Sequence, residues 1–75
     1  MLLHVESHPG LHGDMEPLAF LLGDERIEVL QILDRWIATD HSYFKIEASD
    51  RAMYILRFTP EQRQWELTLF QAPAV

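Results

Sequence analysis

Alternation of apolar and polar side chains in the second half of the chain is the strongest constraint on the fold. Apolar residues occupy every second position through most of segments 43–48, 52–58 and 65–71, and short polar stretches separate these segments. Successive side chains of a β-strand point to opposite faces, so each segment predicts a strand with one buried face. Three such strands in a row predict an antiparallel meander.

The cost of burying a charge decides the register of the first hairpin. A two-residue loop at 50–51 would place Arg57 opposite Phe44 in the core, whereas a three-residue loop at 49–51 places Leu56 there. An unpaired charge in a core is costly, and a slip of one residue exchanges the two faces of a strand. The three-residue loop is therefore the prediction.

The second hairpin predicts an apolar patch on the face turned to solvent. A six-residue loop at 59–64, with a short helical turn after Pro60, makes Phe58 face Trp65 inside the barrel. The same register places three apolar residues outside, with an aromatic residue alongside. An exposed apolar patch predicts a contact with a protein partner or a second copy. The candidate partner-binding residues are Tyr43, Met53, Ile55 and Phe70.

Segment 26–37 admits two interpretations. Its apolar residues recur at helical spacing, which predicts an α+β fold with one helix packed on the three-stranded meander. The alternative is a strand in which a bulge near Leu30 shifts the alternation. In either case the larger aromatic residues are expected in the core, namely Trp36, Phe44, Tyr54, Phe58 and Trp65.

The first fourteen residues predict a flexible tail, because Pro9, Gly10 and Gly13 interrupt any apolar period. Residues 15–71 are expected to form a single domain, and 72–75 a frayed end. The tail carries His4, His8 and His12, whose spacing would bring the imidazoles together only on a helix. Proline disfavours that helix, so these histidines are weak candidate ligands and no metal site is predicted.

Composition excludes several functions. The 75 residues carry a net charge of −6, which disfavours nucleic acid as a partner, and the basic residues are scattered. There is no cysteine, no apolar run of about 20 residues and no basic start typical of a secretory signal, so a cytoplasmic protein with no membrane association is expected. No nucleophile–base pair and no glycine-rich phosphate loop is evident, which predicts a protein without a cofactor or enzymatic activity.

Short stretches between residues 16 and 71 follow a recurrent order. They are Pro17-x-x-Phe20, a turn at Gly23, Val29 followed by Leu33 and Trp36, Tyr43-Phe44-Lys45-Ile46, Tyr54-Ile55-Leu56 and Trp65-Glu66-Leu67. This order resembles a bacterial family of small all-β domains of uncharacterised activity, with SH3-like barrels, some encoded near DNA-repair polymerases. The resemblance implies a strand for 26–37. The acidic turn at 23–25 departs from the basic turn usual in that family, and turn 49–51 lacks its glycine.

These observations together predict an all-β fold, a five-stranded antiparallel SH3-like barrel with one short helical turn. The expected function is a non-enzymatic interaction or accessory module that binds a protein partner through an exposed sheet face. One alternative is an accessory nucleic-acid-binding component linked to DNA repair, which would use Arg26, Arg35, Lys45 and Arg57. Another alternative is weak binding of a metal or a small ligand.

Overall fold

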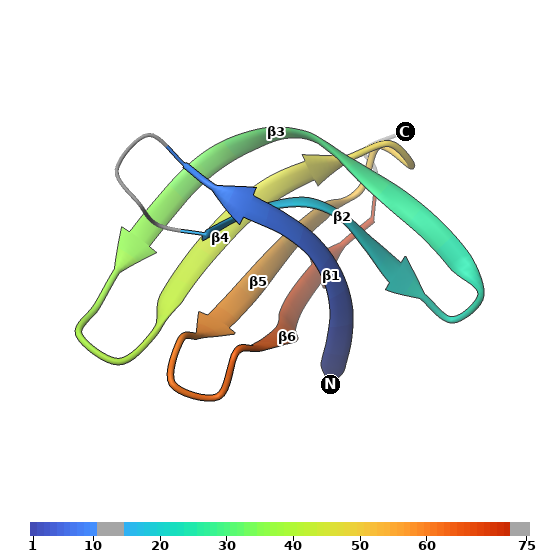
Figure 1. Ribbon diagram of the computed structural model, residues 1–75. Helices are drawn as coiled ribbons and strands as arrows, with labels where there is room; N and C mark the ends of the chain where they lie inside the picture. Colours follow the sequence, from blue (N-terminus) through green and yellow to red (C-terminus); the bar gives the residue numbers. More distant parts are fainter. Residues whose placement is uncertain (11–14, 73–75) are drawn as a thin grey trace.

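Six antiparallel strands form a small closed barrel in the computed structural model, which describes residues 1–10 and 15–72 (Figure 1). Each strand pairs with its neighbour in the chain, and β1 pairs with β6 to close the barrel. The strands are β1 (Leu2–Pro9), β2 (Met15–Leu22), β3 (Glu25–Ile37), β4 (Ser42–Ala48), β5 (Met53–Thr59) and β6 (Gln64–Gln71). The predicted all-β antiparallel barrel is confirmed, with six strands in place of five.

The β4–β5 hairpin has the predicted register. Leu56 lies opposite Phe44, and Arg57 lies on the outer side opposite Tyr43. The three-residue loop places Arg51 in the left-handed region, with φ of 70°, as such hairpin loops require at this position. Asp50 holds the loop, because its carboxylate accepts hydrogen bonds from the Ala52 N–H (3.0 Å) and the Tyr54 hydroxyl (2.5 Å).

The β5–β6 hairpin follows the prediction over its first half and then departs from it. Phe58 faces Trp65 as predicted, but Ile55 lies opposite Leu69 rather than Thr68 because of a bulge in β6. The loop is shorter than predicted, since Thr59 and Gln64 also pair. A turn over 60–63, closed by one backbone hydrogen bond of 3.2 Å from Arg63 to Pro60, replaces the predicted helical turn.

Strand β3 shows that the helix predicted as the alternative for 26–37 is wrong. Its start pairs with β2, and its longer remaining part pairs with β4. The register shifts twice along β4, between Val29 and Gln31 and between Ile32 and Asp34. The first shift is the bulge near Leu30 that the strand interpretation predicts, and the second is not part of that prediction. Residues on one face of a strand are normally two apart, and a bulge makes them three apart. A spacing of three is also that of one face of a helix, which explains why the segment resembles a helix.

The prediction of a flexible tail at 1–14 is wrong for Leu2–Pro9, which form strand β1 of the barrel. The side chains of Leu3 and Val5 pack against the core, and those of His4, Glu6 and His8 are exposed. This is an ordinary two-residue alternation. The rest of the predicted tail, 11–14, and residues 73–75 of the predicted frayed end lie outside the described residues.

The core lies inside the barrel and is rich in aromatic side chains. Phe20 packs edge-on against Tyr54, and Trp65 stacks between Phe44 and Phe58 at centroid distances of 5.6 and 4.7 Å. Four of the five aromatic residues predicted as core are buried there. Trp36 is the exception, because β3 turns it to the outside, where it is 47% exposed.

We expect Asp50→Ala to destabilise the domain by about 1–3 kcal/mol, because the buried Tyr54 hydroxyl would lose its acceptor. Urea unfolding followed by tryptophan fluorescence measures this change. Tyr54→Phe should lower the free energy of unfolding less in the Asp50 variant than in the wild type, since the two side chains interact. Asp24→Ala, in the exposed β2–β3 turn, is the matched control. Additive effects would contradict the assignment.

Removal of β1 should damage the whole barrel. A chain that starts at Met15 loses the packing of the partly buried Leu3 and Val5, worth up to about 1.5–3 kcal/mol each. It also leaves β2 paired with β3 alone and β6 paired with β5 alone. We expect its melting temperature to fall by at least about 15 °C, or cooperative unfolding to disappear. The control is the full chain with His4→Ser and His8→Ser on the exposed side. An unchanged melting temperature for the truncated chain would contradict a structural role for β1.

Candidate functional site

Three cross-strand rows of side chains form the outer face of the β3–β6 sheet. The pairing of the strands places a mainly polar row at one end, a mixed row in the middle and an aromatic and charged row at the other end. These rows are Gln31–Glu47–Met53–Gln71, Asp34–Lys45–Ile55–Leu69 and Trp36–Tyr43–Arg57–Glu66. We call this surface the outer face.

The centre of the outer face is an apolar groove. Met53, Ile55 and Leu69 line it together with Lys45, and its volume is about 70 Å³. Leu69 is 53% exposed, and sequence reasoning missed it because the alternation of β6 assigns it to the core. The bulge at Thr68, whose hydroxyl donates to the Ile55 carbonyl at 2.9 Å, reverses the faces beyond it.

The same bulge makes the placement of Phe70 on this face wrong. Phe70 lies opposite Tyr54, not Met53, and its ring is 5.2 Å from the Tyr54 ring. It is 52% exposed, on the part of β6 that has no pairing with β1. Of the four predicted partner-binding residues, the structure therefore brings Tyr43, Met53 and Ile55 to one face. On β6, Leu69 takes the position predicted for Thr68, and Gln71 takes the position predicted for Phe70.

An aromatic cluster borders the groove. Trp36 and Tyr43 are cross-strand neighbours, and the His41 ring stands edge-on to Tyr43 with centroids 5.1 Å apart. The Arg57 guanidinium lies 5.9 Å from the Tyr43 ring, a cation–π distance. Its Nε is buried without a hydrogen-bond partner among the described residues. Half-exposed aromatic rings next to a cation offer stacking surface and charge together.

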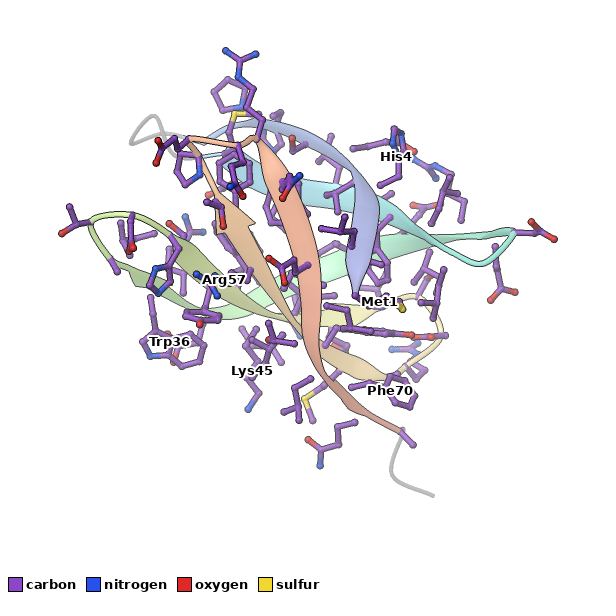
Figure 2. The ribbon with its side chains drawn as sticks, turned by 90° about the horizontal axis from the view of Figure 1, so that it is seen from below. Met1, His4, Trp36, Lys45, Arg57 and Phe70 are labelled. Carbon is purple, nitrogen blue, oxygen red and sulfur yellow. The ribbon has the colours of Figure 1, made fainter. Side chains whose placement is uncertain are left out.

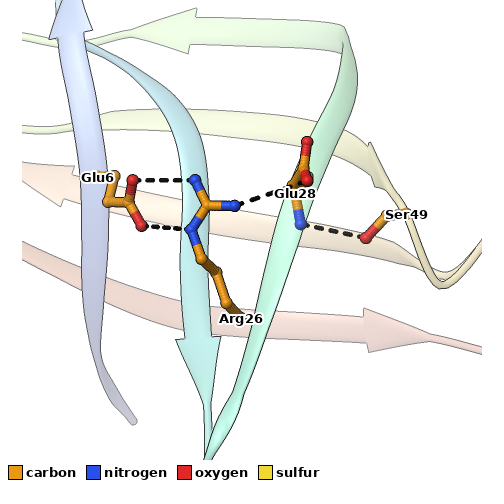
Figure 3. A network of polar contacts seen from close by, with 4 residues as sticks. All are labelled: Glu6, Arg26, Glu28 and Ser49. Carbon is orange, nitrogen blue, oxygen red and sulfur yellow. Dashed lines mark hydrogen bonds and ion pairs between the residues drawn. The ribbon is translucent and has the colours of Figure 1, made fainter.

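The four basic residues predicted for nucleic acid do not assemble into one site. Arg26 makes two hydrogen bonds to the Glu6 carboxylate, at 2.7 and 3.0 Å, and lies 3.6 Å from Glu28 (Figure 3). Arg35 is paired with Glu16 at 2.6 Å, at a different part of the barrel. Only Lys45 and Arg57 share the outer face, so half of the predicted positive charge is neutralised elsewhere.

The Glu6–Arg26 pair crosses strand β2. Glu6 and Glu28 both lie opposite Ala19, which is fully buried beneath them, so a small side chain leaves room for the bridge. The hydrogen bond from Arg26 lowers the pKa of Glu6, and the same bond raises the pKa of Arg26. The Ser49 hydroxyl accepts a hydrogen bond from the Glu28 N–H at 3.1 Å and extends the network to the β4–β5 loop (Figure 3).

The histidines do not form a metal centre within the described residues. His4 and His8 lie on the same side of β1, but four residues of a strand separate side chains by about 13 Å. His8 Nε2 is 3.8 Å from the Glu16 carboxylate. In residues 1–10 and 15–72 no three metal-ligating side chains come together. His12 lies outside the described residues.

A cavity of about 460 Å³ opens where β1 diverges from β6. Its walls are mostly apolar, and Arg63 in the β5–β6 turn supplies a positive charge. The lining residues are Val5, Ser7, Met15, Phe58, Pro60, Arg63 and Trp65. This cavity is the place that a small ligand would occupy if the small-ligand alternative held.

Comparisons of the chain with protein-family models, curated proteins and solved structures give no match. The resemblance to SH3-like bacterial domains therefore stays a prediction. No helix in the described part of the chain is long and apolar enough to cross a membrane.

The Glu6–Arg26 pair should make stability depend on pH. The pKa of Glu6 lies below its ordinary 4.5 in the folded protein, so the stabilisation is present above that value and is lost as the pH falls through the lowered pKa. We expect Glu6→Gln to melt at a lower temperature than the wild type at about pH 6. The difference should shrink as the pH falls below 4.5 and vanish once Glu6 is protonated in the folded protein.

Salt provides the control for this prediction. Both partners are exposed, so the difference between wild type and Glu6→Gln should also shrink in about 1 M NaCl. The pKa of Asp40 is also lowered, by its bond to His41, but Asp40 is unchanged in both proteins and cancels. A difference independent of pH and salt would show that Glu6 acts by packing instead.

Proposed function

We propose that this domain is a non-enzymatic interaction module that binds a protein partner through the outer face, centred on Met53, Ile55 and Leu69. The observation that carries the proposal is the bulge in β6, which turns Leu69 out of the core and beside the groove. Burial of one such side chain in an interface removes apolar surface worth about 1.5–3 kcal/mol. The groove therefore supplies the affinity.

The rest of the outer face has the composition of an interface rim. Lys45 and Glu47 flank the groove, and Tyr43 and Trp36 extend it with half-exposed rings. Protein–protein interfaces are enriched in aromatic residues and carry a polar rim around an apolar core. The absence of cysteine supports a reducing compartment such as the cytoplasm.

Accessory nucleic-acid binding is the second candidate, favoured by one observation. Lys45 and Arg57 lie on the same face as the rings of Trp36 and Tyr43, and cations beside aromatic rings are how single strands are held. The net charge of −6 and the pairing of Arg26 and Arg35 with carboxylates oppose it.

We expect Ile55→Asp and Leu69→Asp each to weaken partner binding at least tenfold, because a carboxylate would be buried without a partner. The measurement is affinity capture from lysate of the native cell, followed by mass spectrometry. Leu18→Asp is the matched control, because Leu18 is 48% exposed and lies on β2, away from the outer face. This variant should capture the same partner as the wild type does. Thermal melting checks that every variant is folded.

Two outcomes would contradict the proposal. Equal capture by the wild type and both outer-face variants would reject this surface. Capture of nucleic acid that falls steeply with salt and is lost in Lys45→Gln would replace the protein partner by the second candidate.

A further inference from the structure

Strand β6 has a stretch of edge that no described strand pairs with. β1 meets β6 only at Leu2–Glu66 and Leu3–Trp65, and the Leu67 N–H donates to the Met1 carbonyl at 2.8 Å. β6 continues to Gln71, so residues 68–72 have β5 on one side and no described neighbour on the other. Figure 2 shows β6 passing Met1 and continuing toward Phe70.

This edge lacks the usual defences against pairing. Proteins protect open edges with charged residues, prolines or bulges. Segment 68–72, with the sequence TLFQA, contains no charge and no proline, and its one bulge lies at its start. Leu69 and Phe70 expose about half of their surfaces on its two sides.

A second open edge, on β3, is protected. Beyond Glu28, strand β3 no longer pairs with β2, but this stretch carries two bulges. It also carries Asp34 and Arg35, and Arg35 is held by Glu16 of β2. In contrast to this edge of β3, the end of β6 is open to another strand.

We propose that the β6 edges of two copies of this chain pair antiparallel and form a symmetric dimer. Two copies of the chain repel, because each carries a net charge of −6. Segment 68–72 brings no charge to a contact, so this edge is the place where two copies meet with the least repulsion. In a symmetric antiparallel pair the two-fold axis passes through the middle of the paired segment. For segment 68–72 the middle residue is Phe70. Phe70 then lies opposite its counterpart, and Leu69 lies opposite Gln71.

The dimer joins the β3–β6 sheets of the two copies into one continuous sheet. A contact of five residues per copy is small, so the dimer is weak and forms at high micromolar concentration. This inference does not require the proposed function, although Leu69 belongs to both surfaces. Phe70 belongs to the edge alone and Ile55 to the outer face alone, so variants separate them.

The experiment uses sedimentation of the full chain from about 10 µM to about 1 mM, the range in which a small interface associates. Phe70→Glu and Phe70→Lys should each raise the dissociation constant at least tenfold, since like charges would meet at the axis. An equimolar mixture of the two should dimerise again, because opposite charges then meet. Ile55→Asp should dimerise as the wild type does.

Hydrogen exchange gives a second measurement that needs no variant. Amides of 68–72 in the wild type should become protected as concentration rises, and those of β3 should not change. A wild type that stays monomeric at about 1 mM, a dimer that both Phe70 variants preserve, or a mixture that stays monomeric would overturn the proposal.

Discussion

A strand of 13 residues that pairs with β2 at its start and with β4 along the rest has to bend, and in β3 two bulges supply the bend. The barrel depends on this bend, since β3 continues the strand order from β2 to β4. Where β3 has left β2, the ion pair between Arg35 and Glu16 still connects them at 2.6 Å. A straight β3 would stay beside β2 or β4 but could not serve both, and the core of Phe20, Phe44 and Tyr54 would open.

Regular alternation could be predicted from the sequence, and bulges could be placed only in part. The register of β4 and β5 followed from the cost of burying Arg57, a large and local effect. The bulge in β6 involves one hydrogen bond from Thr68 and no distinctive residue, so nothing in WELTLFQ marks it. Its consequence is large, because every side chain beyond it changes face. The sequence therefore places Tyr43, Met53 and Ile55 correctly on the outer face and places Phe70 there wrongly.

Strand β1 was missed for a different reason. Pro9, Gly10 and Gly13 predict a loop. That prediction also covered the residues before Pro9, whose own alternation is that of a strand. Leu3, Val5 and Ser7 alternate with exposed polar residues, which was the available signal. What the sequence could not supply was the partner: β1 is held by β2 and by two residue pairs with β6, a contact 62 residues away along the chain at Leu3 and Trp65. Local propensity is weak evidence for a strand when one of its two neighbours is so distant in the chain.

The stagger of the strands connects the two surface features that the core does not explain. Closing a sheet into a barrel requires each strand to be displaced relative to the next, so the first and last strands overlap only partly. Here they overlap from Met1 to Leu3, which leaves the far part of β1 without β6 and the far part of β6 without β1. The first gap is the cavity between Val5 and Trp65, and the second is the open edge around Phe70. The sequences of both strands alternate as in a strand with one buried face. Because β1 and β6 overlap only briefly, apolar side chains of that alternation meet solvent at both gaps.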